Sequence, residues 1–402
     1  MRLRALAAAA LAATALTACG GSGSDGKQTV TMWIYPVIPD QTAHQAFWDG
    51  QSAAFEKANP GIDVKVEIYP WAKRDEALST AIAGNKAPDV VYMIPDQLPK
   101  YVKTLQPIEL QDAGGHREAA VRSVTVDGKV TAAPLLMTAQ PLICNQRAFD
   151  AAGVKDFPAT WEDLLKLAPE FKKKGIDVTN YWADPAQTLN MSFYPLLWQA
   201  GGEVFSPDGR SAAFGGPEGV RALTFLKQLA DGGFVEKDLL TGLPKFEQTR
   251  AAQNKVACTW QHLPADVKSF WGEDNIRVRP PLTAAKQVAY GTVGSLALLK
   301  GADDKDAAAK WIAFATRAEA ADAYDRAAGA FSPRKTALYA GDPVLGEVEK
   351  TLDLTTAGPL HPKARDVMGV LSPEIQAALV GGKSPEQALA DAAKAANALL
   401  GS

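Results

Sequence analysis

The chain has 402 residues, of which 47% are hydrophobic and 22% are charged, and its formal net charge is −3. This length and composition allow a sizeable core and are typical of two globular units. The interspersed charges leave no basic stripe that could neutralise phosphates, which sets aside a nucleic-acid-binding protein. After the first 18 residues no apolar run approaches the length of a membrane span, so only the N-terminus is expected to touch lipid.

The N-terminus has the pattern of a secretory leader. Arg2 and Arg4 precede an uncharged, alanine-rich run, which is too short to remain in a bilayer as a span. The residues Leu16-Thr17-Ala18-Cys19 resemble the lipobox of bacterial lipoproteins, in which the cysteine receives a diacylglycerol and becomes the mature N-terminus. We therefore predict a signal peptide over 1–18 and a flexible tether over 19–27. Cys19 is predicted to be lipidated, with palmitate among the attached acyl chains. An ordinary cleaved signal with a chance cysteine is the alternative.

From Thr29 the chain alternates strand-like and helix-like segments, a pattern typical of an α/β sheet with helices on its faces. Strands are predicted over 29–35, 63–69 and 88–94. Asp40 is expected to cap a helix that stops at 59–61, and a second helix is expected to end at Gly84.

Two later helices carry N-terminal capping signals. Thr160 is a predicted N-cap, and Asp163 three residues later makes a variant of the capping box. Near the C-terminus, Ser384 is the predicted cap, Pro385 takes the first helical position and Gln387 is the expected box partner. No internal repeat is visible, so these helices belong to globular units and not to a repeat array.

Two cysteines follow the leader, Cys144 in "PLICNQ" and Cys258 in "KVACTW". Both contexts are apolar, so both side chains are expected to be buried. Outside the cytoplasm the two could pair, but two buried thiols are the expectation.

Several stretches together carry a family resemblance. They are "FEKANPGIDVKVE", "LSTAIAGNKAPDVVYM", "DGKVTAAPLLMTAQPLICNQRAFDAAGV", "PATWEDLLKLA", "WQAGGEVF", "AAQNKVACTW" and "KDAAAKWIAFATRAEA". Because these stretches follow one another in the family's order, the chain resembles the extracellular solute-binding proteins of bacterial ABC importers, specifically the maltose-type and other oligosaccharide-binding lipoproteins. It departs from that pattern at Cys144, where the family usually has tyrosine, and at Cys258, where methionine is usual.

The resemblance implies a two-lobe α/β fold of the type II periplasmic-binding-protein class, with a hinge and an interlobe cleft that closes on ligand. The expected first lobe is 28–138 plus 292–338, and the second is 139–291 plus 339–402. The expected crossings between the lobes lie near 137–141, 290–292 and 333–340.

The resemblance also implies a function. The protein is expected to be a monomeric substrate-binding lipoprotein, anchored outside the cytoplasmic membrane, that captures a carbohydrate, preferably an oligosaccharide. It would deliver this sugar to the membrane permease of an ABC transporter and perform no chemistry itself, since a partner hydrolyses ATP. No cofactor is expected.

Aromatic side chains at strand ends are the first candidates for ligand contact, because the apolar C–H faces of sugars pack on flat rings. Trp71, Trp182 and Trp260 are favoured, and Trp33, Tyr35 and Trp271 follow. The remaining tryptophans at helix-like positions are expected to be core residues: Trp48, Trp161, Trp198 and Trp311.

Polar candidates surround these rings. Asp96 aligns with an aspartate that binds sugar hydroxyls in maltose-type members, and Gln97 accompanies it. Thr138 falls where such members often carry glutamate, so the identity of the sugar stays open. Further candidates are His262 with Gln261, and Asp184 with Gln187.

The sequence gives less support to other classes of function. The chain has no Gly-x-Ser-x-Gly elbow or His-Glu-x-x-His helix, and its histidines lack the spacing of metal ligands. A secreted glycoside hydrolase remains an alternative, because its two carboxylates can be far apart in sequence. A receptor of the same fold for a polyamine or a glycerol phosphodiester is the other alternative, without the enrichment in acids or arginines that such ligands favour.

Overall fold

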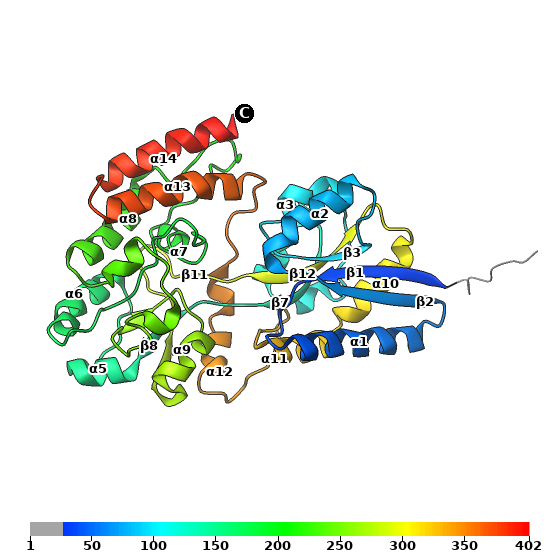
Figure 1. The fold of residues 1–402 in the computed structure, drawn as a ribbon, viewed down its shortest axis with the longest axis horizontal. Coiled ribbons are helices and arrows are strands. Elements are labelled where there is room, and N and C mark those ends of the chain that lie inside the picture. The colour runs from blue at the N-terminus through cyan, green and yellow to red at the C-terminus, as the bar shows by residue number, and fades with distance from the viewer. Residues whose placement is uncertain (1–26, 402) are drawn as a thin grey trace, which may run out of the picture.

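The computed structural model describes residues 27–401, so the predicted signal peptide and Cys19 lie outside the described part of the chain. Two α/β units lie side by side, one carrying the blue and cyan N-terminal segments and the other the green segments and the red C-terminal helices (Figure 1). Several strands and coil segments run between them. This is the two-lobe architecture that the sequence predicts.

The first unit is built on a six-stranded sheet in the order β2-β1-β3-β12-β4, with β7 also paired to β12. Its strands are β1 (Gln28–Ile34), β2 (Ile62–Ile68), β3 (Val90–Met93), β4 (Leu105–Gln106), β7 (Ala133–Met137) and β12 (Val293–Leu299). Its helices are α1 (Gln41–Ala58), α2 (Arg74–Ala83), α3 (Leu98–Tyr101), α4 (Glu118–Ser123), α10 (Lys305–Ala315) and α11 (Ala318–Ala328), and β5 (Thr125–Val126) pairs with β6 (Lys129–Val130).

Both faces of this sheet are covered. Along β3, Val90 and Tyr92 belong to one buried cluster, whereas Val91 and Met93 belong to the cluster on the other face. This alternation follows from the two-residue period of a strand, and the apolar residues 90–94 of the strand predicted over 88–94 are what a doubly covered strand needs. The strands β1 and β2 also lie within a residue of their predicted ranges.

The second unit has a smaller sheet in the order β10-β8-β9 and a larger share of helices. Its strands are β8 (Leu142–Asn145), β9 (Cys258–Thr259) and β10 (Ile276–Arg279). Its helices are α5 (Gln146–Ala152), α6 (Trp161–Lys172), α7 (Tyr194–Gln199), α8 (Pro217–Asp231), α9 (Pro264–Trp271), α13 (Ala364–Leu379) and α14 (Pro385–Leu400). The predicted core tryptophans of both units, Trp48, Trp161, Trp198 and Trp311, are all at most 6% exposed.

The predicted helix caps at Asp40, Thr160 and Ser384 are all present, but one predicted capping box is incomplete. The Asp40 carboxylate accepts a hydrogen bond from the Ala43 N–H at 2.7 Å, and Thr160 closes its capping box with Asp163. The Ser384 hydroxyl accepts from the Gln387 N–H at 3.2 Å. The Gln387 side chain, however, donates to Asp391, one turn further along α14 (2.8 Å), so the predicted box at Ser384 is only half formed.

The expectation of two free thiols is wrong. Cys144 on β8 and Cys258 on β9 are directly opposite each other in an antiparallel pair, with their Cα atoms 4.0 Å apart, and they form a disulfide. Both residues are fully buried. The register of the two strands therefore brings together cysteines that are 114 residues apart in sequence.

The segments between the units pair with one another. The Thr138 N–H donates to the Thr292 carbonyl at 2.9 Å, and the Gln140 N–H donates to the Tyr290 carbonyl at 2.8 Å. On the other side, β11 (Ala289–Tyr290) runs parallel to β13 (Thr355–Thr356). These paired segments form the connection about which the units can bend.

Contacts with the first unit continue beyond the predicted crossing at 333–340. The Pro333 carbonyl accepts from the Arg117 N–H at 2.9 Å, and Val348 and Leu352 are buried in a core cluster of the first unit. Helix α12 (Leu345–Glu349) lies between the units in Figure 1, and Val344 just before it packs on Trp271 and its neighbours in the second unit. From Val344 to β13 the chain therefore contacts both units, and its backbone pairs with β11 at β13.

Candidate functional site

Four of the predicted site residues lie together at the edge of the first unit. Trp71 follows β2 and is half-buried, with its indole N–H donating to the Pro36 carbonyl at 3.0 Å. Its ring centroid is 4.8 Å from that of Tyr35, which is buried. Burial raises the pKa of Tyr35 to about 12, so the phenol stays protonated at neutral pH. The ring of Trp71 is thus held in place while part of its surface reaches solvent.

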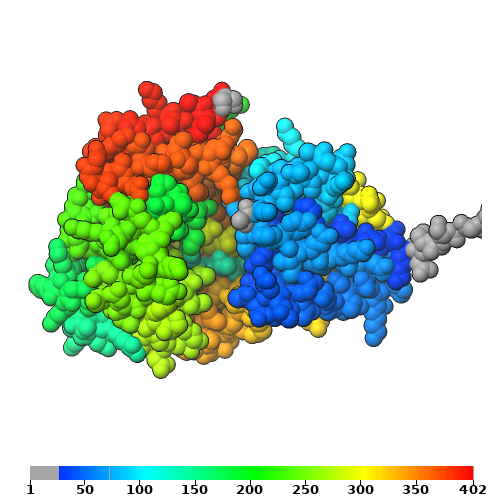
Figure 2. Space-filling model, viewed as in Figure 1, coloured from blue at the N-terminus to red at the C-terminus, as the bar shows by residue number. Residues whose placement is uncertain are grey.

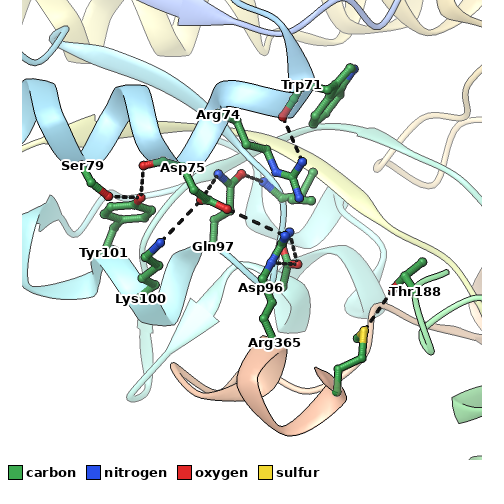
Figure 3. Close-up of polar contacts among 12 residues, drawn as sticks. Trp71, Arg74, Asp75, Ser79, Asp96, Gln97, Lys100, Tyr101, Thr188 and Arg365 are labelled. Atoms are coloured by element: carbon green, nitrogen blue, oxygen red, sulfur yellow. Dashed lines mark hydrogen bonds and ion pairs between the residues drawn. The ribbon is translucent and has the colours of Figure 1, made fainter. Parts of the chain in front are cut away.

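Asp96 and Gln97 come just after β3, as the sequence predicts. Gln97 is buried, with its side-chain oxygen accepting from the Ile94 N–H at 3.2 Å and its amide donating to Asp75 at 3.0 Å. Through these two bonds the Gln97 side chain organises the loop that follows β3. Figure 3 shows the Gln97 side chain between the strand end and Asp75.

Asp96 is engaged by a cation from the second unit. Its Oδ2 atom accepts from Nε and Nη2 of Arg365, at 3.0 and 2.6 Å, and Arg365 projects from α13 (Figure 3). The same guanidinium has Nη1 3.8 Å from an Asp75 carboxylate oxygen. Oδ1 of Asp96 is buried without a hydrogen-bond partner among the described residues. The predicted sugar-binding carboxylate therefore lies where the two units meet.

The hinge strand lies close to this ion pair. Burial raises the pKa of Tyr290 on β11 to about 12, whereas a hydrogen bond with Thr292 lowers it. The charges of Asp96 and Arg365 act on the same phenol in opposite directions, Asp96 raising the pKa and Arg365 lowering it.

A cavity of about 410 Å³ in the second unit gathers the other group of predicted residues. Its lining is Trp182, Gln187, Thr188, Met191, Phe246, Glu247, Gln261, His262, Asp266 and Phe270. The Trp182 backbone N–H donates to the Gln261 side chain at 2.9 Å, which joins two segments that are far apart in sequence. The Trp182 indole N–H is buried without a partner among the described residues. An unpaired buried donor beside a cavity is a group that a ligand acceptor would satisfy.

His262 contributes a neutral imidazole to this cavity. Burial lowers its pKa, and the carboxylate of Asp266, 3.8 Å from Nδ1, opposes that shift. Its Nε2 lies 2.9 Å from the side-chain amide nitrogen of Asn180. A neutral imidazole can donate from one nitrogen and accept at the other, so it can recognise a hydroxyl group.

The cavity adjoins the helix that carries Arg365. Thr188 lines the cavity, and its hydroxyl lies 3.6 Å from the sulfur of Met368, one turn after Arg365 on α13. In Figure 3 Arg365 lies directly below Asp96, and Thr188 lies to the right of this pair. Thr188 thus links the second-unit cavity to the helix whose first turn carries Arg365, the partner of Asp96.

The other predicted residues lie elsewhere. Trp260 and Trp271 are core residues, at 6% and 0% exposed, whose indoles donate to the carbonyls of Ser192 (3.2 Å) and Ala251 (2.8 Å). Trp271 therefore offers no surface to a ligand in this structure, because α9 turns its ring into a cluster with Ile143.

Three further candidates have local roles. Trp33 stacks on Tyr69 with ring centroids 4.1 Å apart and lines a separate cavity with Glu67 and Lys86. The Thr138 hydroxyl accepts from the Thr292 N–H (3.2 Å) in the hinge, and Asp184 closes a turn by accepting from the Ala186 N–H (2.9 Å). These contacts arise from backbone geometry that spacing along the chain does not reveal.

Sequence reasoning missed Arg365, Asp75 and Asn180. A charged residue in the first turn of a helix normally faces solvent, so "HPKARDV" carries no signal for Arg365. Among residues 27–401, no three His, Cys, Asp or Glu side chains come together as a metal-binding group. Within the same range no helix combines the length and apolar character needed to cross a bilayer.

The sequence of this chain also matches the model of a known protein family. Residues 38–322 match the family model described as bacterial extracellular solute-binding protein. The chain belongs to this family. Its two lobes, hinge and maltose-binding-protein-like fold are those of the solved structures that resemble it, and proteins of this family bind solutes.

Three similar proteins illustrate the family. A protein of Brucella abortus (strain 2308) is 24% identical over 373 residues, covering 88% of this chain and 90% of its own. The diacetylchitobiose binding protein DasA of Streptomyces coelicolor is 28% identical over 210 residues, 48% of this chain and 47% of its own. The crystal structure of a cyclic alpha-maltosyl-1,6-maltose binding protein from Arthrobacter globiformis superposes with a TM-score of 0.79 at 19% identity, covering 93% of this chain and 99% of that one.

Proposed function

We propose that this solute-binding protein captures a carbohydrate, preferably an oligosaccharide, between its lobes. The observation that carries the proposal is the cavity lined by Trp182, Gln261 and His262, which Thr188 links to the helix that carries Arg365, the partner of Asp96. Flat rings and neutral hydrogen-bonding groups match the C–H faces and hydroxyls of sugars. The names of DasA and of the Arthrobacter protein, both carbohydrate binders, support this ligand class.

We also propose how the lobes divide. The first lobe comprises 28–138 and 292–354, and the second comprises 139–291 and 355–402. The burial of Val348 and Leu352 in the first-lobe core favours 354 over 338 as the last boundary. Ligand contacts from both lobes would then favour closure, because a solute shifts the equilibrium only by its differential affinity for the closed state.

The role in the cell follows from the family and the leader. The protein, as a monomer, would hand its sugar to the permease subunits of an ABC importer outside the cytoplasmic membrane, without cofactor or chemistry of its own. A diacylglycerol on Cys19 would anchor it, with the glycine-serine tether giving it reach.

A thermal-shift screen tests the ligand class. The purified protein is heated with mono- and oligosaccharides, polyamines and glycerol phosphodiesters, because a ligand that binds only the folded state raises the melting temperature. We expect a saturable shift with one sugar class, and no sugar products after prolonged incubation. A shift with polyamines or phosphodiesters alone would overturn the carbohydrate proposal, and sugar cleavage would favour a hydrolase.

The control variants separate binding from stability. Trp182→Ala should abolish the sugar-induced shift, because Trp182 lines the cavity. Trp260→Ala is the matched control for loss of an indole: its ring lies in the core, so it should lower the melting temperature without ligand. A sugar-induced shift that Trp182→Ala leaves intact would place the sugar elsewhere.

A further inference from the structure

We propose that Arg365 is a positioning residue that holds the two lobes together across the cleft, through the first-lobe carboxylates Asp75 and Asp96. This inference goes beyond the proposed function, because all groups in the contact belong to the protein and the identity of the solute does not enter it. The contact spans 269 residues of sequence between Asp96 and Arg365.

The first lobe presents two carboxylates that can bind a cation. The side chains of Asp75 and Asp96 are 25% and 16% exposed, and both approach Arg365. Asp75 is fixed from behind, because the Gln97 amide donates to its Oδ1 and the Tyr101 hydroxyl donates to its backbone carbonyl at 3.1 Å. Figure 3 shows these residues converging from α2 and from the segment after β3. Carboxylates that are already oriented lose little freedom when they bind a guanidinium.

Arg365 moves only with the second lobe. It lies in the first turn of α13, and Val367, Leu371 and Ile375 of the same helix are buried in the second-lobe core. Figure 2 shows the orange segment at this end of α13 touching the cyan surface of the first lobe. A bond between Arg365 and Asp96 therefore restrains the lobes from swinging apart about the hinge strands.

The geometry also suits a reversible contact. The Arg365 side chain is 44% exposed, so water and salt can reach the ion pair and weaken it. One oxygen of Asp96 takes both guanidinium donors, and the other is left without a partner among the described residues. The contact thus favours closed lobes without locking them, and a solute that also needs closed lobes would bind more tightly because of it.

Small-angle X-ray scattering of the protein without added solute tests the proposal. We compare the radius of gyration of wild type with that of Arg365→Gln, Arg365→Lys and Asp75→Asn. Arg365→Gln and Asp75→Asn should both increase the radius of gyration at low salt. Arg365→Lys should do so less, because lysine keeps the charge but lacks the planar fork. Wild type should expand in about 1 M salt, where the Debye length falls to about 3 Å.

Lys363→Gln is the matched control. It removes one positive charge just before the same helix, but Lys363 pairs with Asp366 within the second lobe, at 3.8 Å. Its radius of gyration should equal that of wild type, and melting curves should show that all variants remain folded. If Arg365→Gln and Asp75→Asn scatter like wild type at both salt concentrations, the proposal is wrong.

Ligand affinity gives a second readout once a solute is known. Arg365→Gln should weaken binding about fivefold, which corresponds to about 1 kcal/mol of lost coupling. Tighter binding would mean that Arg365 competes with the solute for Asp96, and would overturn the positioning role. The scattering experiment needs no solute, so a failed carbohydrate screen leaves it intact and the two proposals can fail separately.

Discussion

Cys144 and Cys258 face each other across the β8–β9 pair and are joined by a disulfide in the core of the second lobe. The strand that holds Cys258 leads directly to Gln261 and His262, which line the cavity. The bond therefore fixes one wall of the candidate site to the strand that enters this lobe from the hinge.

Removing the disulfide should destabilise the protein. The bond closes a long loop, and such cross-links typically stabilise by about 2–4 kcal/mol, chiefly by restricting the unfolded chain. The double variant Cys144→Ala/Cys258→Ala should melt at a lower temperature than wild type. Reductant should lower the melting temperature of wild type and leave that of the double variant unchanged. Equal responses of the two proteins to reductant would contradict the pairing.

The tryptophans of the second lobe should respond differently to truncation. Trp271→Ala should lower the free energy of unfolding by about 3–5 kcal/mol, because it empties a fully buried site. Trp182→Ala should cost less stability, since its indole borders a cavity and its N–H lacks a partner among the described residues. Denaturant titration measures both losses. A larger loss for Trp182→Ala would place its ring in the core instead.

Gly291 should be intolerant of a side chain. A Cβ there would collide with the Thr138 carbonyl and lie 2.7 Å from the Cβ of Thr355, where the connecting segments pack together. Gly291→Ala should therefore lower the free energy of unfolding by about 1–3 kcal/mol. In Gly301→Ala the new Cβ meets nothing within 4 Å, so it should melt like wild type. Equal melting temperatures for the two variants would contradict close packing at the hinge.

Asp325 should make stability fall as pH rises. Burial, followed by the charge of Asp322, raises the pKa of Asp325 from 3.8 to about 9, and neither carboxyl oxygen has a hydrogen-bond partner among the described residues. Because the folded pKa lies above the unfolded one, its stabilising contribution is complete below pH 3.8 and is lost as pH rises towards 9. The slope can reach about 1.4 kcal/mol per pH unit.

Asp325→Asn keeps the shape of the side chain and removes the charge. Its stability should exceed that of wild type at pH 8, with the difference shrinking towards pH 4, as measured by denaturant titration at each pH. Asp306→Asn, at an exposed position, is the control and should follow the wild-type pH profile. If Asp325→Asn and wild type show parallel profiles, the buried carboxyl does not titrate as expected.

His262 should act in the opposite pH direction. Burial lowers its pKa below 6.5, so the unfolded chain takes up a proton more readily than the folded protein does. The stability due to neutral His262 is present above pH 6.5 and is lost as pH falls through the lower folded pKa. His262→Gln should lose less stability than wild type between about pH 7 and pH 5. The other histidines are common to both proteins, so an identical loss would count against a buried neutral His262.

The sequence by itself determined the local elements and their order along the chain. Period-two apolar residues set β1 and β2, and side-chain oxygens at Asp40 and Thr160 set the starts of α1 and α6, because these signals act between residues close together in the chain. The family resemblance, spread over most of the chain, supplied the two lobes. The half-formed capping box at Ser384 shows that even a local pattern can be overridden. The Gln387 side chain donates to Asp391 on the same helix and not to the backbone of the cap.

Only the tertiary structure decided which distant groups meet. Strand register paired Cys144 with Cys258, and helix packing turned Trp271 into the core while leaving Trp182 at a cavity. The contact between Asp96 and Arg365 depends on how two lobes sit about a hinge, and no spacing or periodicity encodes that arrangement. Long-range contacts are fixed by the sum of packing over both cores, so they become readable only when the chain is folded.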